Sequence, residues 1–290
     1  MDIMIKKNKD QILLNIFFAF VSLCIIIPFI MLVTISLTSE KEIALSGYKL
    51  IPKKLDFSAY RYVFSNPQSI VNAYKVTFIF SVCSMVLATL LTAMAAYPLV
   101  SRNMLGKRQI SFYYYFTMLF SGGLVPSYIL ITRYLHMGDT LWVYIIPAIV
   151  SPWNVFMMRT FFKDIPSSIL ESAEIDGASE YRTFVSIVLP VSKPVLATIA
   201  LLTFLAKWND WFTSMLYINN QNLVSLQYLL QRILQNIDIL QSMNSNANTA
   251  NMNISEIPTE STRMAMAVVA AGPALLVFPF FQKYFVKGLT

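Results

Sequence analysis

The sequence has very little of what enzymes use for catalysis. It contains one histidine, His136, and two cysteines, Cys24 and Cys83, among its 290 residues. A single histidine excludes any metal site or catalytic dyad that needs a second one. Both cysteines lie inside apolar runs without metal-ligand spacing, which indicates small core residues rather than a disulfide framework. No glycine-rich loop ends in Gly-Lys-Ser/Thr, so no Walker A nucleotide site is present. We therefore expect neither enzyme chemistry nor a bound cofactor or metal.

Charge is also scarce. Only 13% of the residues are charged and 56% are hydrophobic, a composition too apolar for a soluble globular domain. The net charge of +7 would suggest nucleic-acid binding in a soluble protein. In a membrane protein, lysine and arginine more often set the topology and meet anionic headgroups. The first apolar run is long enough to span a membrane, and no small-residue cleavage pattern follows it, so no cleaved signal peptide is expected.

Six apolar runs approach the length of about 20 residues that a membrane crossing requires. They lie near Ile12–Leu37, Val76–Tyr97, Ile110–Ile131, Leu141–Met158, Pro194–Thr213 and Met264–Phe281. The sequence therefore predicts an all-α membrane protein with six transmembrane helices. We expect a short N-terminus over residues 1–11 and a single transmembrane domain over residues 12–290.

The distribution of lysine and arginine predicts the orientation of these helices. With the N-terminus inside, the inner segments hold twelve basic residues in about 66 positions and the outer ones hold nine in about 97. This bias places both termini and the segment 163–190 in the cytoplasm, with large outer loops at 38–75 and 214–263. The second outer loop contains an amphipathic stretch, Leu223–Leu240, followed by an asparagine-rich run over 241–253 that we expect to be a mobile loop.

The segment 163–190, called the elbow below, is polar and lies between two strongly apolar runs. Its acidic residues within ten positions are Glu171, Glu174, Asp176 and Glu180. A transmembrane helix would not tolerate this charge. Pro166 is suited to the first position of a helix, and Gly177 to the left-handed residue after its end. Ile169, Leu170 and Ala173 then share one face of this helix, apart from the acidic face.

A second short helix is predicted after Gly177. Ser179 is suited to its N-cap, and Pro190 is expected to stop it. The apolar stripe of this helix consists of Tyr181, Phe184, Val185 and Val188. An amphipathic elbow below a membrane bundle is suited to contact a partner outside the membrane.

The elbow resembles the cytoplasmic signature of importer permeases of the ATP-binding cassette (ABC) class. That signature is E-A-A, three residues, G, nine residues, I-x-L-P. The matching positions are Glu171, Ser172, Ala173, Gly177, Ile187, Leu189 and Pro190. Ser172 replaces the usual second alanine, a change of one small residue for another. The resemblance implies a type I ABC importer permease in which these residues, together with Asp176, couple the chain to an ATPase.

Three further stretches resemble the carbohydrate-importer permeases, in particular those that serve larger oligosaccharides. They are Ser121–Ile131, Phe204–Phe212 and Pro279–Thr290. Asp210 stands where glutamate is frequent, and the last stretch stops sooner than in many relatives. The resemblance implies a plasma-membrane heterodimer with a second permease, two cytoplasmic ATPase subunits that carry ATP and magnesium, and an extracytoplasmic binding protein that delivers the sugar.

Two predicted spans carry candidate substrate-pathway residues. They are Trp208, Asn209, Asp210 and Trp211 in the fifth span, and Trp153 and Asn154 in the fourth. Aromatic rings stack on sugar rings, while amides and carboxylates bond hydroxyl groups. On an ideal helix Phe204, Trp208 and Trp211 share a face within about 60°, and we expect Trp208 and Asn209 to border the cavity. The open alternative is helix packing by the aromatic residues, with Lys207 and Asp210 as an ion pair.

Three other functions stay open. An ABC permease for a non-sugar solute would carry the same signature. A membrane-embedded transferase or hydrolase would bind metal through its acidic loop, but Glu171, Glu174 and Asp176 do not form a D-D-x-x-D-like cluster. A proton-coupled carrier needs ionisable groups in mid-span, where only Lys207 and Asp210 qualify.

Overall fold

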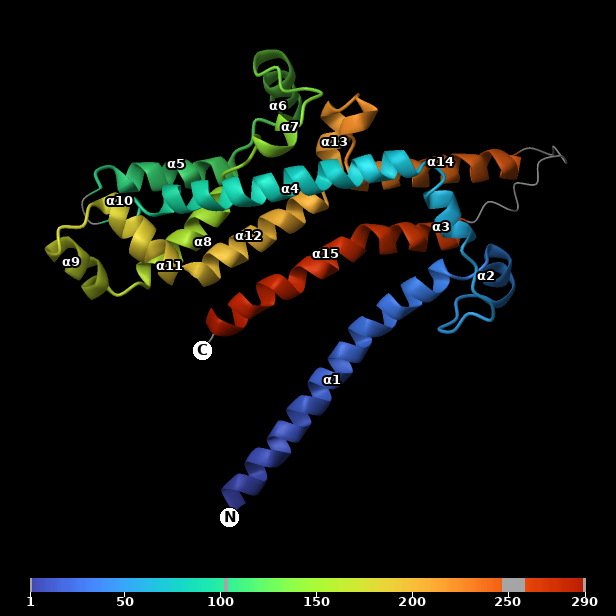
Figure 1. Ribbon diagram of the computed structural model, residues 1–290, viewed down its shortest axis with the longest axis horizontal. Helices are drawn as coiled ribbons and strands as arrows, with labels where there is room; N and C mark the ends of the chain where they lie inside the picture. Colours follow the sequence, from blue (N-terminus) through green and yellow to red (C-terminus); the bar gives the residue numbers. More distant parts are fainter. Residues whose placement is uncertain (1, 102–103, 247–258, 289–290) are drawn as a thin grey trace. The chain divides into compact units, whose positions relative to one another are not determined.

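The computed structural model describes residues 2–101, 104–246 and 259–288 (Figure 1). All regular structure in these ranges is helical. The chain divides into two compact units. The first contains Met1–Pro67 and Arg232–Gly272, and the second contains Gln68–Gln231 and Pro273–Thr290. The expectation of one domain over residues 12–290 stays a prediction.

The first unit is built around three helices near the N-terminus and parts of the last two. They are α1 (Asp2–Ser36), α2 (Glu40–Ser46), α3 (Ser58–Val63), α14 (Leu226–Asn246) and α15 (Glu260–Gly288). Nothing in the most apolar window of α1 is buried within the chain. Side chains such as Leu13 and Phe20, 69% and 65% exposed, need a lipid or protein environment to cover them.

A carboxylate from α2 holds the start of α15. The side chain of Glu40 accepts hydrogen bonds from the backbone N–H groups of Glu260 and Ser261, at 3.1 and 3.2 Å. The hydroxyls of Thr259 and Ser261 donate to the same carboxylate at 2.8 and 3.0 Å. The first N–H groups of a helix have no partner within it, and the helix dipole favours negative charge there. The contact therefore ties the segment around α2 to the start of α15.

The second unit contains most of the remaining helices. They are α4 (Pro67–Ala96), α5 (Lys107–Leu119), α6 (Leu124–Ile129), the π-helical turn η1 (Leu130–Tyr134), α7 (Trp142–Ile145), α8 (Pro152–Lys163), α9 (Ser167–Ile175), α10 (Glu180–Thr183), the π-helical turn η2 (Phe184–Val188), α11 (Leu189–Val191), α12 (Lys193–Trp208), α13 (Phe212–Tyr217) and the 3-10 turn η3 (Gln221–Leu223). Within this unit α9 to α11 gather at one end, and α6, α7 and α13 lie toward the other (Figure 1).

The core of the second unit is formed where α4, α8 and α12 meet. The buried face of α4 carries small side chains at helical spacing, namely Thr77, Ser81, Ser84, Ala88, Thr92 and Ala96. Small residues let helices approach closely in a membrane protein. One buried cluster joins Ala93 and Ala96 of α4 with Val155 and Met158 of α8 and Ile199 of α12. The cluster holds the end of the bundle from which the elbow begins.

The described helices do not confirm the expected six membrane spans. Three of the described helices are long and apolar enough to cross a membrane, at Gln11–Ser36, Pro67–Ala96 and Glu260–Pro279. They confirm the first, second and last predicted spans, although α4 begins well before the predicted Val76. The count rises to five if each of two bent helix pairs is one span.

The predicted third span is bent rather than continuous. Helix α5 ends at Leu119, and the segment from α6 to η1 leaves at an angle of 111°. Gly123 at the start of α6 has a φ of +88°, a conformation that glycine adopts at little cost. The glycine pair at 122 and 123, with Pro126 in the next turn, explains why the helix ends here.

The predicted fourth span, Leu141–Met158, is wrong as a continuous helix. It consists of the four-residue α7, a non-helical stretch and the twelve-residue α8. Pro147 and Pro152 account for the interruption, because a proline disfavours helical geometry in the residue before it and Pro152 begins α8. Ala148 has a φ of +56° within the break. A hydropathy pattern alone does not reveal such a break.

The amphipathic stretch Leu223–Leu240 is confirmed as most of α14. All six of its periodic apolar residues are buried or half-buried: Leu226, Leu229, Leu230, Ile233, Leu234 and Ile237. The mobile loop expected over 241–253 is wrong for residues 241–246, which continue α14. Residues 247–253 of the asparagine-rich run lie outside the described residues, so a mobile loop there stays a prediction. The side chains of residues 280 and 283–290, in the C-terminal stretch, also lie outside them.

Candidate coupling elbow and substrate-pathway residues

The first helix of the elbow, α9, ends as the sequence predicts. Gly177 has a φ of +72°. Its N–H donates to the carbonyl of Glu174 at 3.0 Å, and the N–H of Ala178 donates to the carbonyl of Ala173 at 2.9 Å. This pair of bonds is a Schellman motif, which satisfies carbonyls left open at a helix end. Pro166 precedes the first helical residue of α9 instead of occupying it.

The two faces of α9 differ in burial. Ala173 is 5% exposed, and Leu170 packs against the core cluster beneath. Ile169, which was expected on the same face, is 38% exposed. The other face carries exposed residues, namely Glu171, Ser172, Glu174, Ile175 and Asp176. The spacing of the signature thus separates one buried alanine from exposed acidic residues and from Ile175, which is 86% exposed.

The second helix begins at the predicted cap. The hydroxyl oxygen of Ser179 accepts the N–H of Arg182 at 3.3 Å. Phe184 and Val188 are buried, as predicted, but Tyr181 and Val185 are 76% and 41% exposed. The expected four-residue stripe is therefore only half buried. The predicted stripe assumed the α-helical period of 3.6 residues. Residues Phe184–Val188 instead form the wider π-helical turn η2, so the four side chains do not share one face.

Pro190 does not stop this helix, contrary to prediction. The helical path runs from Glu180 to Val191 and breaks at Ser192, where α12 leaves at 78°. Proline lacks an N–H and its ring meets the preceding turn of an α-helix. The π-helical turn immediately before Pro190 widens that turn, so the chain accommodates the ring. Ile187 and Leu189 are half-buried beside it, and Pro190 itself is exposed.

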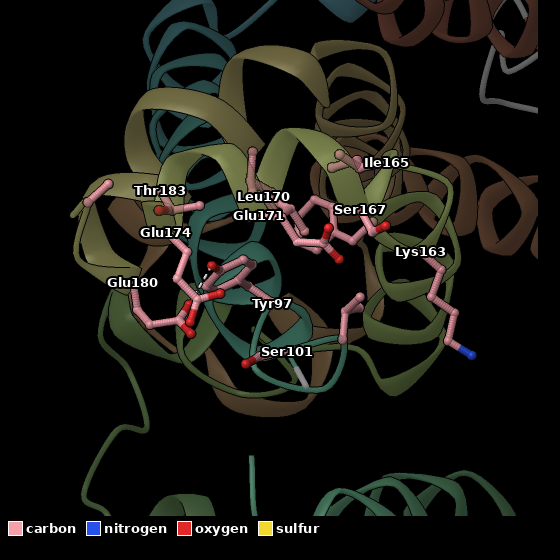
Figure 2. A pocket seen from close by; sticks show the side chains of 14 residues that line it. Tyr97, Ser101, Lys163, Ile165, Ser167, Leu170, Glu171, Glu174, Glu180 and Thr183 are labelled. Atoms are coloured by element: carbon pink, nitrogen blue, oxygen red, sulfur yellow. Dashed lines mark hydrogen bonds between the residues drawn. The ribbon is translucent and has the colours of Figure 1, made fainter. Parts of the chain in front are cut away.

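A cavity of about 400 Å³ lies between the elbow and the ends of α4 and α8. Three carboxylates line it, those of Glu171, Glu174 and Glu180, together with Lys163 and Tyr97 (Figure 2). Within the described part of the chain, no group of three His, Cys, Asp or Glu residues is arranged to hold a metal ion.

Tyr97 is the residue of this region that the sequence did not single out. Its hydroxyl donates to Glu180 Oε2 at 2.6 Å, drawn as a dashed line in Figure 2. Its ring centroid lies 5.0 Å from that of Phe184 and 6.5 Å from that of Phe162. In the sequence, Tyr97 is recognisable only as a tyrosine at the end of an apolar run. Tyrosines are common at that place because they lie at membrane interfaces, so the position alone does not indicate a contact with the elbow.

The fifth-span candidates separate where α12 ends. Trp208, the last residue of α12, is 2% exposed and its ring lies 5.7 Å from Phe204 at an interplanar angle of 23°. Trp211 precedes α13 and is 37% exposed. The prediction that Phe204, Trp208 and Trp211 share a face of one helix is wrong, because the helix stops after Trp208. A role of Trp208 in the pathway stays a prediction.

Polar groups close the end of α12. The exposed Asn209 donates from Nδ2 to the carbonyl of Leu205 at 2.9 Å, and its Oδ1 accepts from Gln227 at 3.3 Å. Asp210 Oδ1 accepts the N–H of Thr213 at 3.0 Å. These turn-forming bonds explain why the helix does not reach the predicted end at Thr213.

Lys207 does not pair with Asp210, contrary to what the alternative of helix packing by the fifth-span aromatic residues predicted. Its ammonium donates to the backbone carbonyl of Tyr144, while the Asp210 carboxylate caps the following turn. Tyr144 is fully buried and stacks on Phe80, with ring centroids 4.3 Å apart. The lysine therefore joins the end of α12 to α7.

The fourth-span candidates lie at the start of α8. Trp153 is 63% exposed and Asn154 is half-buried in the first turn of that helix. The signature residues of the elbow are thus gathered around α9 to α11, whereas the pathway candidates lie at the start of α8 and the end of α12.

Comparison with known proteins shows the family. Residues 74–290 match the family described as "Binding-protein-dependent transport system inner membrane component". The chain is 36% identical to protein LplC of Bacillus subtilis over 264 residues, which cover 91% of this chain and 87% of LplC. It is also 36% identical to YtcP of Bacillus subtilis, a polygalacturonan/rhamnogalacturonan transport system permease protein, with 97% of each chain covered.

A solved structure shares the fold. It is a bacterial ABC transporter involved in the import of the acidic polysaccharide alginate, and one of its chains matches with a TM-score of 0.78 and 26% identity. The match covers 96% of this chain and 97% of that one. These findings reject the membrane-embedded enzyme considered from the sequence. The chain belongs to the family of binding-protein-dependent transport system inner-membrane components and has the fold of a type I ABC importer permease.

Proposed function

We propose that this chain forms half of the translocation pathway for an oligosaccharide in an ABC importer. A second permease completes the pathway, an extracytoplasmic binding protein delivers the sugar, and two separate ATPase subunits bind ATP and magnesium. Sugar as cargo is supported by relatives named for polygalacturonan/rhamnogalacturonan and for arabinooligosaccharides. A non-sugar solute is the competing proposal.

The observation that carries the coupling role is the two-faced elbow. Ala173 anchors α9 to the core of the second unit, while Ser172 and Asp176 are exposed and Glu171, also exposed, lines the cavity beside the elbow. Exposed Ile175 and Tyr181, 86% and 76% exposed, add apolar area beside the charges. Interfaces combine buried aromatic or aliphatic anchors with hydrogen-bonded charges at their edges. We assign this surface to contact with the ATPase.

The inward residues of the signature have a supporting role. Gly177 forms the turn, and Ile187, Leu189 and Pro190 shape the path from η2 to α12. A displacement of α9 is thereby passed to α12, the helix that ends at the candidate pathway residues. We propose Asn209, Asp210 and Trp211 as sugar contacts, because they are exposed or half-buried at that end.

We further propose six membrane crossings with both termini in the cytoplasm. The bent pair of α5 with α6 and η1 serves as one crossing, α12 alone makes another, and α7 with α8 makes an interrupted one. Interrupted helices are compatible with a membrane where protein covers the open backbone groups. The larger basic content of residues 98–109 and 159–193 supports a cytoplasmic elbow.

The direct test is reconstitution of the complete importer in proteoliposomes. ATP hydrolysis and uptake are measured with the binding protein loaded with oligogalacturonides, with neutral arabino-oligosaccharides, or with amino acids and peptides as controls. We expect stimulation by one sugar class and none by the non-sugar solutes. Stimulation by peptides or amino acids alone would contradict the assignment to carbohydrate.

A further inference from the structure

The contact between Tyr97 and Glu180 joins two parts of the chain that the proposed function requires to move together. Tyr97 directly follows α4, and Glu180 is the first residue of α10. The bond is 2.6 Å long and involves a carboxylate. Hydrogen bonds to ionised groups are shorter and about twice as strong as neutral ones. This bond is therefore one of the stronger specific contacts between the elbow and the bundle.

Packing alone does not determine the position of the elbow at this point. The cavity of about 400 Å³ separates α9 from the ends of α4 and α8. A polar-lined cavity of this size holds water, so its lining groups contact solvent there instead of one another. In Figure 2, Tyr97 and Glu180 face each other at one side of the cavity and Lys163 points away at the other. The bond from Tyr97 to Glu180 therefore adds a direct link at this side of the cavity to the packing of Leu170 and Phe184 in the core cluster.

The Tyr97 ring strengthens the junction by its apolar contacts. It lies against Phe184 of η2 and Phe162 of α8, which are 9% and 2% exposed. The Tyr97 side chain therefore contacts the helical path Glu180–Val191 at two points. Its hydroxyl bonds to Glu180, and its ring lies against Phe184. A shift of α10 must either move the end of α4 or break this hydrogen bond.

We propose that Tyr97 is a positioning residue for coupling, and that its hydrogen bond to Glu180 transmits movement of the elbow to α4. The inference rests on the proposed function of the elbow. It assigns Glu180 an internal role, whereas the exposed Asp176, together with Glu171 at the cavity beside the elbow, meets the ATPase. Tyr97 itself makes no contact with nucleotide or sugar in this assignment.

The test uses the complete importer in proteoliposomes and compares three single variants. Tyr97→Phe removes the donor and keeps the ring, Glu180→Ala removes the acceptor, and Glu180→Gln keeps an oxygen that accepts. We expect Tyr97→Phe and Glu180→Ala to lower sugar transported per ATP hydrolysed by about tenfold, the effect of losing one hydrogen bond to a charged group. Glu180→Gln should restore most of the ratio.

The double variant Tyr97→Phe/Glu180→Ala separates coupling from two independent defects. Its transport-to-hydrolysis ratio should equal that of either single variant, because the same bond is lost in all three. Tyr134→Phe is the matched control, since it removes a hydroxyl from a side chain that is 76% exposed. Multiplied effects in the double variant would overturn the proposal.

Two further measurements distinguish this inference from simpler outcomes. A purely structural role would lower the melting temperature of Tyr97→Phe but leave its transport-to-hydrolysis ratio at the wild-type value, which would also overturn the proposal. If wild-type importer shows no sugar stimulation, the proposed function itself fails. If wild type is stimulated and Tyr97→Phe behaves identically, only the coupling role of Tyr97 fails.

Discussion

At the scale of single residues, Gly177 is an exposed turn position at which contacts within the chain do not oppose a side chain. Its backbone is left-handed, yet a Cβ atom placed there would meet nothing within 4 Å. The chain itself therefore leaves room for a side chain. Aspartate and asparagine tolerate this backbone conformation better than most residues do.

Gly177→Asp should therefore insert into the membrane with a melting temperature close to wild type, yet lose sugar-stimulated ATP hydrolysis. The added carboxylate would project from the elbow turn into the surface that we assign to the ATPase. The control Ser168→Asp adds the same charge to another exposed position of α9 and should retain stimulation. Normal stimulated hydrolysis by reconstituted Gly177→Asp would show that this turn does not approach the ATPase.

Trp208 and Trp211 provide a second comparison between residues. Trp208 is almost fully buried, whereas Trp211 is 37% exposed. Emptying a buried tryptophan site costs about 3–5 kcal/mol, so Trp208→Ala should lower the melting temperature far more than Trp211→Ala. Uptake of a short and a long oligosaccharide is measured beside the melting curves. An altered uptake ratio in Trp208→Ala with unchanged melting would assign Trp208 to the pathway instead of the core.

At the scale of elements, the junction between α2 and α15 is held by one carboxylate. Burial alone would raise the pKa of the Glu40 carboxyl, but the hydrogen bonds from Glu260, Thr259 and Ser261 lower this pKa below its ordinary value of 4.5. A group whose pKa is lower in the folded state stabilises the fold above the unfolded-state pKa. That contribution is lost as the pH falls through the folded-state pKa.

Glu40→Ala should destabilise the protein by about 1–3 kcal/mol near neutral pH, because the donors at the start of α15 lose their acceptor. The control Lys41→Ala changes an exposed neighbour and should have little effect. Melting temperatures are measured in detergent across a pH series. Below about pH 4.5 the wild type should lose more stability than Glu40→Ala. If the melting temperatures of wild type and Glu40→Ala changed with pH by the same amount throughout the series, a role of the ionised carboxylate would be refuted.

The broken elements also have a common local origin. The bend after α5 follows a glycine pair, and the interruption between α7 and α8 lies between Pro147 and Pro152. Both features were visible in the sequence. Their geometry was not, because glycine and proline permit either a kinked span or a complete break, and neighbouring helices decide which one forms.

At the scale of the whole molecule, the proposed topology requires the elbow and the outer loop 38–75 to lie on opposite sides of the membrane. Cys24 and Cys83 are replaced by alanine, and a single cysteine is introduced as Ser168→Cys or Lys54→Cys, both at exposed positions. In intact cells a membrane-impermeant maleimide should label only Lys54→Cys. Ser168→Cys should react after permeabilisation. Labelling in the reverse order would contradict the cytoplasmic position of the elbow.

The sequence by itself determined the all-helical membrane class, the first, second and last long helices, and the turn at Gly177. Each follows from local rules: an apolar run of sufficient length, or a glycine where a helix must end in a left-handed residue. The spacing of the signature from Glu171 to Pro190 also indicated the family that the comparisons show. None of these conclusions required knowledge of distant contacts.

Only the tertiary structure decided how the elbow is attached and where the fifth helix ends. The bond from Tyr97 to Glu180 joins residues 83 positions apart, and no periodicity relates them. The π-helical turn before Pro190 allowed a helix to continue where the local rule predicted a stop. Likewise, Trp208 became a core residue and Trp211 an exposed one because polar bonds of Asn209 and Asp210 end α12 between them. At the elbow, attachment depends on distant neighbours that the local pattern does not contain. At the end of α12, side-chain bonds to residues three and four positions away decide the outcome, and the spacing of apolar residues does not contain them.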